Sequence, residues 1–425
     1  MSEDLGKMSK KKDAPEIRFP GFTDAWEQRG FSSVFEILQN NTLSRADLSD
    51  ESGLAQNIHY GDVLIKYGEV LDVGNEPLAY INSEKIVTAM KNSYLQNGDV
   101  IIADTAEDTA VGKCSEIANL GEKTVLSGLH TIPVRPKEKY ASGYLGYYLN
   151  SNSYHDTLMP LMQGTKVTSI SKSALQGTSI SYPKSIDEQA KISAYFQNLD
   201  HLITLHQRKL DKLHKYKKAM LQKMFPQNGA DVPEIRFPGF TDAWEQRKFG
   251  SMLDERREKT ISENEDTLLS CAIEGMFLNT ELFSHFRGSS NIGYLKIKQN
   301  DLILSAQNLH LGNCNVNLRF KHGIISPAYK VYGLVNCNPL FVQAWVKQDS
   351  TKDFFLKATT EGASACRKNV VWDELYKQEL FIPSLAEQQK IGEYFTNLDR
   401  LITLHQRKCE MLQKYKKAML QKMFV

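Results

Sequence analysis

The chain has 425 residues, of which 24% are charged, and its 52 basic and 50 acidic side chains leave a formal net charge of +2. At roughly 100–200 residues per domain this length predicts about two to four domains, and a hydrophobic content of 41% excludes a disordered chain. No apolar run is long enough to cross a membrane, and the polar first residues do not predict a secretion signal. Six scattered cysteines without a CxxC pair indicate a reduced, cytoplasmic protein.

Two segments of the chain occur twice. Residues 13–29 return as residues 231–247, and only one of 17 positions differs. Residues 188–225 return as residues 387–424, with 29 of 38 positions identical. The chain is therefore an internal duplication, and each half contains a short motif, a variable block and a long repeated segment.

The duplication predicts six segments in chain order. They are an N-terminal arm with the motif (1–29), a first variable block (30–182), a first long helix (183–225), a linker with the second motif (226–247), a second variable block (248–382) and a second long helix (383–425).

The variable blocks are predicted to be β-rich, because they contain short β-branched runs bounded by Gly, Asn or Asp. Residues 95–102 resemble residues 297–304, and residues 111–114 resemble 311–314, so the blocks are interpreted as diverged copies of one domain. The expected fold class is mixed α/β (α+β) with a small twisted sheet in each copy. Predicted strands are 63–65, 100–102, 123–126, 131–134, 302–304, 323–325 and 329–332, and predicted helices are 141–151 and 339–348.

The long repeated segments are predicted to be helices that pair as an antiparallel coiled coil. Their apolar residues follow a heptad over nearly five repeats that contain no proline. About 38 helical residues span roughly 57 Å, so such a pair could act as a ruler between the two blocks. The predicted helix-pairing core is Ile192, Phe196, Leu199, Ile203 and Leu213 with Ile391, Phe395, Leu398, Ile402 and Leu412.

Polar residues interrupt this seam at equivalent places in both helices. His206, His405, Lys217 and Lys416 occupy heptad core positions. They are interpreted as layers that set the register rather than as metal ligands. The narrow seam also favours a coiled coil over a helix that lies on a membrane surface.

No catalytic signature is present. The sequence contains no phosphate-binding P-loop, no GxGxxG after a predicted strand, no HExxH and no zinc-spaced cluster. Asp104, Glu107 and Asp108 could form a nuclease metal site, but the matching residues 305–308 include no acid. A surface loop is therefore the preferred interpretation of this segment, and no metal site is predicted.

Two polar, basic loops late in the blocks suit contacts with phosphates and base edges. They cover residues 163–172 and 361–369. Arg367 could bind guanine bidentately, and an amide such as Gln163 could bind adenine, whereas the alternative is a solvated turn. The candidate DNA-binding residues are Gln163, Thr165, Lys166, Thr168, Ser169, Lys172, Gln307, Asn308, Ser364, Arg367, Lys368 and Asn369.

The junctions before the helices carry a specific pattern, Ile-Ser-Tyr-Pro then Asp-Glu-Gln-Ala-Lys-Ile over 180–192, and Phe-Ile-Pro then Ala-Glu-Gln-Gln-Lys-Ile over 381–391. With these junctions, with Pro-Glu-Ile-Arg-Phe-Pro-Gly-Phe opening each half and with the loop 164–172, the whole chain resembles the DNA-specificity subunits of type I restriction-modification enzymes. The second block departs from the family's loop with Gly-Ala-Ser-Ala-Cys-Arg-Lys-Asn at 362–369. That departure leaves its base preference open.

The resemblance implies a division of labour. Each block would be a target-recognition domain that reads one half of a bipartite site in double-stranded DNA, and the helices would set the unread spacer. Two modification subunits with S-adenosylmethionine would methylate adenine in each half, and two restriction subunits would use ATP and Mg²⁺ to translocate and cut DNA. This chain would supply the address without catalysis, cofactor or membrane contact.

The sequence is also compatible with two alternatives: a duplicated coiled-coil scaffold that binds only proteins, and a stand-alone nuclease that uses Asp104 and Asp108. The charge balance does not exclude DNA, because it is a cancellation between segments. Residues 30–186 carry 12 basic and 17 acidic side chains, a net charge of −5, whereas residues 187–225 and residues 387–425 each carry 8 basic and 4 acidic side chains, a net charge of +4. We therefore expect weak DNA binding by the isolated chain and tighter binding in its assembly.

Overall fold

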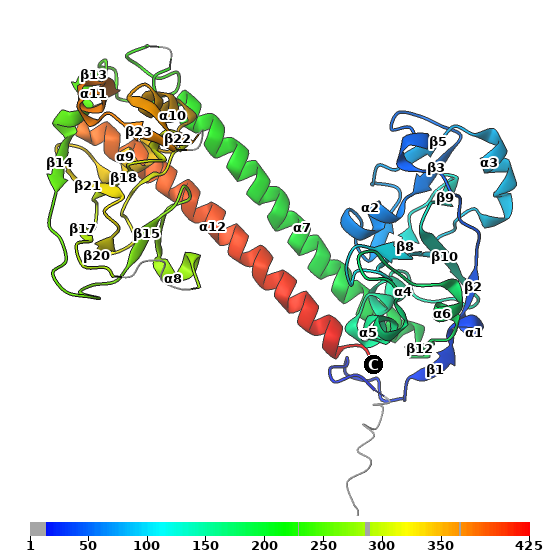
Figure 1. Ribbon diagram of the computed structural model, residues 1–425. Coiled ribbons are helices and arrows are strands. Elements are labelled where there is room, and N and C mark those ends of the chain that lie inside the picture. Colours follow the sequence, from blue (N-terminus) through cyan, green and yellow to red (C-terminus); the bar gives the residue numbers. More distant parts are fainter. Residues whose placement is uncertain (1–13, 228, 285–289, 365–366) are drawn as a thin grey trace, which may run out of the picture. The chain divides into compact units, whose positions relative to one another are not determined.

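The structure is a computed structural model that describes residues 14–227, 229–284, 290–364 and 367–425, with only the backbone described for 361–364 and 367. The chain divides into two compact units, Met1–Leu205 with Lys408–Val425, and His206–Arg407. Each unit contains one variable block and one part of both long helices (Figure 1).

Unit 1 is built on a five-stranded sheet of order β2-β10-β6-β8-β4, in which β4 is parallel to β8 and the other neighbours are antiparallel. A three-stranded sheet of order β5-β3-β9 and two strand pairs, β1-β12 and β7-β11, accompany it. The strands are β1 (Glu27–Gly30), β2 (Phe35–Ile37), β3 (Ala55–Ile58), β4 (Val70–Asp72), β5 (Ala79–Ile81), β6 (Val100–Ala103), β7 (Thr105–Ala106), β8 (Cys114–Ala118), β9 (Val125–Ser127), β10 (Thr131–Pro136), β11 (Thr168–Ser169) and β12 (Ser179–Tyr182). The helices are α1 (Phe31–Val34), α2 (Tyr60–Ile65), α3 (Glu84–Ala89), α4 (Tyr144–Leu149), α5 (Asn152–Leu158) and α6 (Lys172–Gln176).

Unit 2 repeats this plan with a four-stranded antiparallel sheet of order β14-β21-β18-β19. Four strand pairs, β13-β24, β15-β16, β17-β20 and β22-β23, complete its strands. The strands are β13 (Glu245–Lys248), β14 (Leu253–Arg256), β15 (Leu269–Cys271), β16 (Met276–Leu278), β17 (Leu295–Lys298), β18 (Leu302–Ser305), β19 (Cys314–Val316), β20 (His322–Ile325), β21 (Tyr329–Leu334), β22 (Thr359–Ser364), β23 (Arg367–Val370) and β24 (Glu379–Ile382). The helices are α8 (Asn279–Leu282), α9 (Pro339–Trp345), α10 (Asp349–Leu356) and α11 (Trp372–Lys377).

One predicted strand is wrong. Residues 63–65 belong to helix α2, in which Val63 is fully buried whereas Ile65 is 89% exposed. His59 caps this helix by accepting a hydrogen bond from the N–H of Gly61. A helix fits these residues because buried Val63 and partly buried Tyr60 are three residues apart, share one helical face and pack in the same hydrophobic cluster. The other six predicted strands overlap β6, β9, β10, β18, β20 and β21, and the two predicted helices overlap α4 and α9.

The two blocks are diverged copies of one domain, as the sequence predicted. Cys114 begins β8 and Cys314 begins β19, and each follows a glycine at φ +88° two residues earlier, Gly112 or Gly312. In both copies a backbone hydrogen bond also joins the residue after the central strand (β6 or β18) to the turn before the next paired strand (β10 or β21). The N–H of Asp104 donates to the carbonyl of His130 at 3.1 Å in unit 1, and the N–H of Ala306 donates to the carbonyl of Ala328 at 3.0 Å in unit 2.

The two repeated segments are helices of 38 residues each, α7 (Ile186–Lys223) and α12 (Leu385–Lys422). In unit 1 the hydroxyl groups of Tyr195 and Tyr415 are 2.9 Å apart, and in unit 2 those of Tyr394 and Tyr216 are 2.8 Å apart. The start of each helix therefore lies beside the end of the other, and the pair is antiparallel. No helix in the described part of the chain is long and apolar enough to span a membrane.

The predicted helix-pairing residues differ in burial along the seam. Those near the start of each helix are buried, since Phe196 is 0% and Phe395 2% exposed. Ile203, Leu213 and Leu412 are only partly buried. The remaining predicted residues are all buried: Ile192, Leu199, Ile391, Leu398 and Ile402.

The polar residues of the seam contact one another or carboxylates. The Nδ1 atoms of His206 and His405 are 2.8 Å apart, so one imidazole donates and the other accepts. Lys217 contacts Asp399, and Lys416 contacts Asp200. No group of three or more His, Cys, Asp or Glu side chains in the described residues could hold a metal ion.

In each unit the repeated motif binds the start of one long helix and the end of the other. In unit 1 the Arg18 guanidinium donates to the Glu188 carboxylate at 2.6 and 2.9 Å, and Glu188 is 1% exposed. In unit 2 Arg236 forms the same pair with Glu387 at 2.6 and 2.7 Å. Backbone hydrogen bonds from residues 17 and 235 also satisfy carbonyls at the ends of α12 and α7. The two copies of the motif therefore make the same contacts in the two units.

Glu116 is expected to make the stability of unit 1 depend on pH. Its carboxylate accepts the N–H groups of Gly143 at 2.5 Å and Gly146 at 2.9 Å, at the start of α4. Burial nevertheless raises the pKa of Glu116 from 4.5 to about 7. The folded state therefore binds the proton of Glu116 more tightly than the unfolded state does. Protonation of Glu116 thus stabilises the folded state; this contribution to the free energy of unfolding is complete below pH 4.5 and is lost as the pH rises through about 7.

We expect Glu116→Gln to remove this part of the pH dependence, which is on the order of 3 kcal/mol. Urea unfolding at about pH 5 and about pH 8 measures it. The control is Glu122→Gln, because Glu122 is exposed in the same block. An unchanged slope in the Glu116 variant would show that the carboxylate is ionised throughout.

Candidate nucleic-acid interface

The first predicted loop is a narrow hairpin on the surface of unit 1. The backbones of Gln163 and Ser169 exchange two hydrogen bonds of 2.9 and 2.8 Å, and β11 pairs with β7. Gly164 has φ +117°, and a Cβ there would lie 2.0 Å from the carbonyl oxygen of Val167. Only glycine fits this turn, so the loop has one defined shape rather than that of a flexible tether.

The polar side chains of this hairpin face solvent. Gln163, Thr165, Lys166 and Ser169 are exposed, whereas Thr168 is partly buried. Exposed Lys172 follows as the first residue of α6, whose N-terminus is capped by a side-chain hydrogen bond. The hairpin thus carries amides, hydroxyls and ammonium groups that can donate to phosphates and bases.

Sequence reasoning missed a polar cluster next to this hairpin. Asp104 accepts the backbone N–H of Ile170 on its carbonyl, and its carboxylate accepts the Thr105 hydroxyl at 2.7 Å. The Nδ1 atom of His130 is 3.3 Å from the same carboxylate, and the Tyr60 ring packs edge-on against His130 at 5.2 Å. A carboxylate in such a place can accept from the amino group of cytosine.

The members of this cluster come from three separate segments, which is why the sequence did not reveal them. The sequence indicates Asp104 only as a possible metal ligand. The one available signal was its place directly after a predicted strand, where loops of a sheet gather.

Unit 2 presents the same arrangement with different residues. Strands β22 and β23 form a hairpin, and the backbone N–H of Lys368 donates to the carbonyl of Gln307 at 3.1 Å. The structure therefore brings Gln307 and Asn308 beside Lys368 and exposed Asn369. Ser364 and Arg367 lie on the two strands, but their side chains lie outside the described part of the chain, as do residues 365 and 366.

His310 is a buried residue near Lys368 that the sequence did not indicate. It follows Asn308 in a short 3-10 helix and is 9% exposed. Neither ring nitrogen has a hydrogen-bond partner among the described residues. Burial lowers the pKa of His310, and the Lys368 cation lowers it further, so the ring is held neutral. The equivalent position in unit 1 is Ala110.

Comparison with known proteins gives one family. Residues 23–215 match the family model for the type I restriction modification DNA specificity domain. A curated relative, assigned as the MjaX type I restriction enzyme specificity subunit of Methanocaldococcus jannaschii, is 21% identical over 421 residues. This alignment covers 93% of the chain and 92% of the relative.

Solved structures share the fold at low sequence identity. The S subunit of a type-I restriction-modification system from M. genitalium aligns with a TM-score of 0.58 at 12% identity, covering 97% of this chain and 99% of that chain. A chain from a study of complex assembly and conformational transition of the type I R-M system aligns at 0.50 and 14% identity, covering 96% and 98%. The family model matches residues 23–215, the curated relative aligns with 93% of the chain, and the solved structures share its fold, so the chain is similar along its length to the DNA-specificity subunits of type I restriction-modification systems.

Proposed function

We propose that this subunit reads a bipartite DNA target, with one half recognised by each variable block, and directs adenine methylation or ATP-dependent cleavage by partner subunits. The observation that carries the proposal is the repeated interface. Each unit holds one polar hairpin against the segment that follows its central strand, through β11 on β7 in unit 1 and through Lys368 on Gln307 in unit 2. Two equivalent surfaces with different side chains suit two different half-sites.

The helices support the proposal for partner subunits. Outside its seam α7 exposes Leu202 (41%) and Leu205 (50%), and α12 exposes the equivalent Leu401 (44%) and Leu404 (48%). Exposed leucines that recur at corresponding places on a surface helix indicate a protein-binding face. One such face on each helix fits two copies of a modification subunit, and two motor-nuclease subunits would complete the assembly.

The chemistry is proposed to reside in those partners. S-adenosylmethionine would serve methylation, and ATP with Mg²⁺ would serve translocation and cleavage. We place the assembly in the cytoplasm, where the five described cysteines, all buried and free, stay reduced. Because residues 30–186 carry a net charge of −5, the subunit is expected to bind DNA tightly only together with its partners.

A selection from random duplexes, made with the purified subunit and its modification partners, tests the proposal. The expected result is one enriched target with two fixed halves and a spacer of constant length. A duplicated scaffold that binds only proteins would form the same complex and enrich no sequence. Lys166→Ala is a useful companion, because loss of one phosphate contact should weaken binding to all sequences and reduce the salt dependence.

A further inference from the structure

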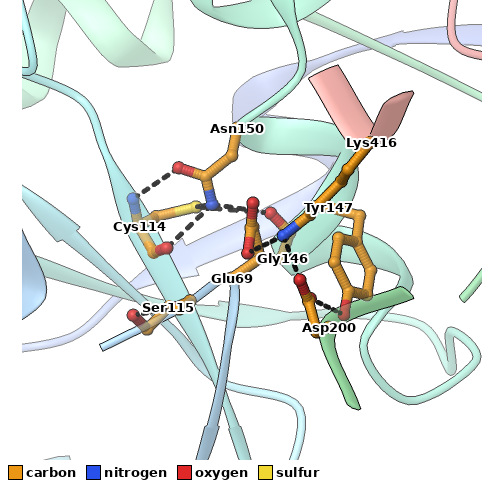
Figure 2. A network of polar contacts seen from close by, with 9 residues as sticks. Glu69, Cys114, Ser115, Gly146, Tyr147, Asn150, Asp200 and Lys416 are labelled. Atoms are coloured by element: carbon orange, nitrogen blue, oxygen red, sulfur yellow. Dashed lines mark hydrogen bonds and ion pairs between the residues drawn. The ribbon is translucent and has the colours of Figure 1, made fainter. Parts of the chain in front are cut away.

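Lys416 of α12 lies in a polar network that joins the helix pair to the first block (Figure 2). Its ammonium group donates to Glu69 at 2.7 Å and to Asp200 at 2.6 Å, and it lies 5.4 Å from the centre of the Tyr147 ring. The Tyr147 hydroxyl donates to the other oxygen of Asp200 at 2.7 Å. Lys416 is only 13% exposed, so these contacts are largely shielded from water.

The four residues have two different origins. Lys416 and Asp200 belong to the repeated helices, and the same pair occurs in unit 2 as Lys217 and Asp399. Glu69 and Tyr147 belong to the first variable block, in the residue before β4 and in α4. The helices therefore supply a repeated ion pair, and the first block adds a second carboxylate and a phenol to it.

The second block adds neither group. The backbone N–H of Ala141 donates to Gln189 of α7, and that of Asn338 donates to the equivalent Gln388 of α12. Ala141 and Asn338 therefore occupy equivalent positions. The residue six positions after each is Tyr147 in the first block and Ala344 in the second. In the described part of unit 2, Asp399 is the one carboxylate ion-paired with Lys217. The Asp399 side chain is 50% exposed, compared with 34% for Asp200.

The contacts of Glu69 continue into the sheet that carries the reading segment. Its carbonyl accepts the backbone N–H of Glu116 in β8 at 2.9 Å. Strand β8 pairs with β6, and β6 leads directly to Asp104 and Thr105 beside the first hairpin. A movement of Glu69 relative to Lys416 would therefore shift the reading surface relative to the helices.

We propose that Glu69 and Tyr147 are positioning residues that fasten the first recognition domain to the Lys416–Asp200 pair and hold its reading surface in one orientation to the helices. The second domain lacks this fastening. The inference rests on the proposed function, because orientation to the helices is what the spacer length would report. Removal of the Glu69 charge is the informative substitution, because the Lys416–Asp200 pair that remains matches the Lys217–Asp399 pair of unit 2.

The test compares Glu69→Gln with Glu76→Gln in the complex with modification subunits. Glu76 is an exposed carboxylate of the same block. The readout is the methylation rate of each half-site on duplexes with the selected spacer or with one base pair added or removed. For Glu69→Gln we expect the ratio of the methylation rate on the selected spacer to that on the altered spacers to fall about tenfold at the first half-site. The second half-site and the Glu76 variant should keep the wild-type discrimination.

Tyr147→Phe provides a second variant that keeps the packing of the ring and removes only the hydroxyl that contacts Asp200. This variant should also reduce the spacer dependence of methylation at the first half-site. The inference is overturned if both variants keep the wild-type spacer preference, or if both half-sites loosen equally. A wild-type complex without any selected target would instead refute the proposed function.

Discussion

Replacement of residues 30–182 by the corresponding block of a related subunit is expected to change one half of the DNA target completely and to leave the other half intact. The structure gives the reason at the ends of the block. Strand β1 pairs with β12, so Gly30 lies opposite Ser179 and Glu27 lies opposite Tyr182. The block therefore leaves and rejoins the rest of the chain at one place, as an inserted domain does.

The exchange is measured by selecting targets from random duplexes before and after replacement. Exchange of residues 248–382 is the matched control, because β13 and β24 bring those ends together through the pairing of Lys248 with Glu379. It should change the other half. If either exchange altered both halves, the assignment of one domain to one half-site would be wrong.

A heptad inserted into both helices is expected to lengthen the preferred spacer by about three base pairs. Seven residues add about 10 Å to a helix, and each base pair adds about 3.4 Å to a duplex. The insertions belong between Leu205 and His206 and between Arg407 and Lys408, where the two units divide. At these points the contacts inside each unit remain intact, and the inserted heptads can pair with each other.

An insertion into one helix alone is the control for this prediction. It would displace either the contact of Tyr195 with Tyr415 or that of Tyr394 with Tyr216. We expect such a variant to lose stability and target methylation rather than to gain a longer spacer. An unchanged spacer in the variant with both insertions would refute the ruler.

Local patterns predicted the helices well and one strand badly. The heptad and the repeat gave helices α7 and α12 to within a few residues, because long periodic segments without proline have one compatible structure. Residues 63–65 are apolar and include β-branched Val63 and Ile65, but they form a helix, since the burial of one face outweighed their strand preference. Short apolar runs are compatible with both structures until their neighbours are known.

The interface was predictable only in part for a related reason. The hairpin of residues 163–169 was visible as a polar loop around a glycine, and the structure gives it a defined shape. Asp104 and His130 are neighbours only because β6 and β10 are paired in the sheet. The partner of a side chain is then set by strand order, which no local spacing in the sequence encodes.

The sequence by itself determined the organisation of this protein: two diverged blocks, two nearly identical helices and a motif that opens each half. These features follow from repetition and periodicity, which are properties of the chain alone. Only the tertiary structure decided what the polar seam residues do. Lys416 and Lys217 occupy equivalent heptad positions, yet Lys416 also binds Glu69 of the first block. The energy of such a charge depends on which groups share its partly buried surroundings, and folding decides that.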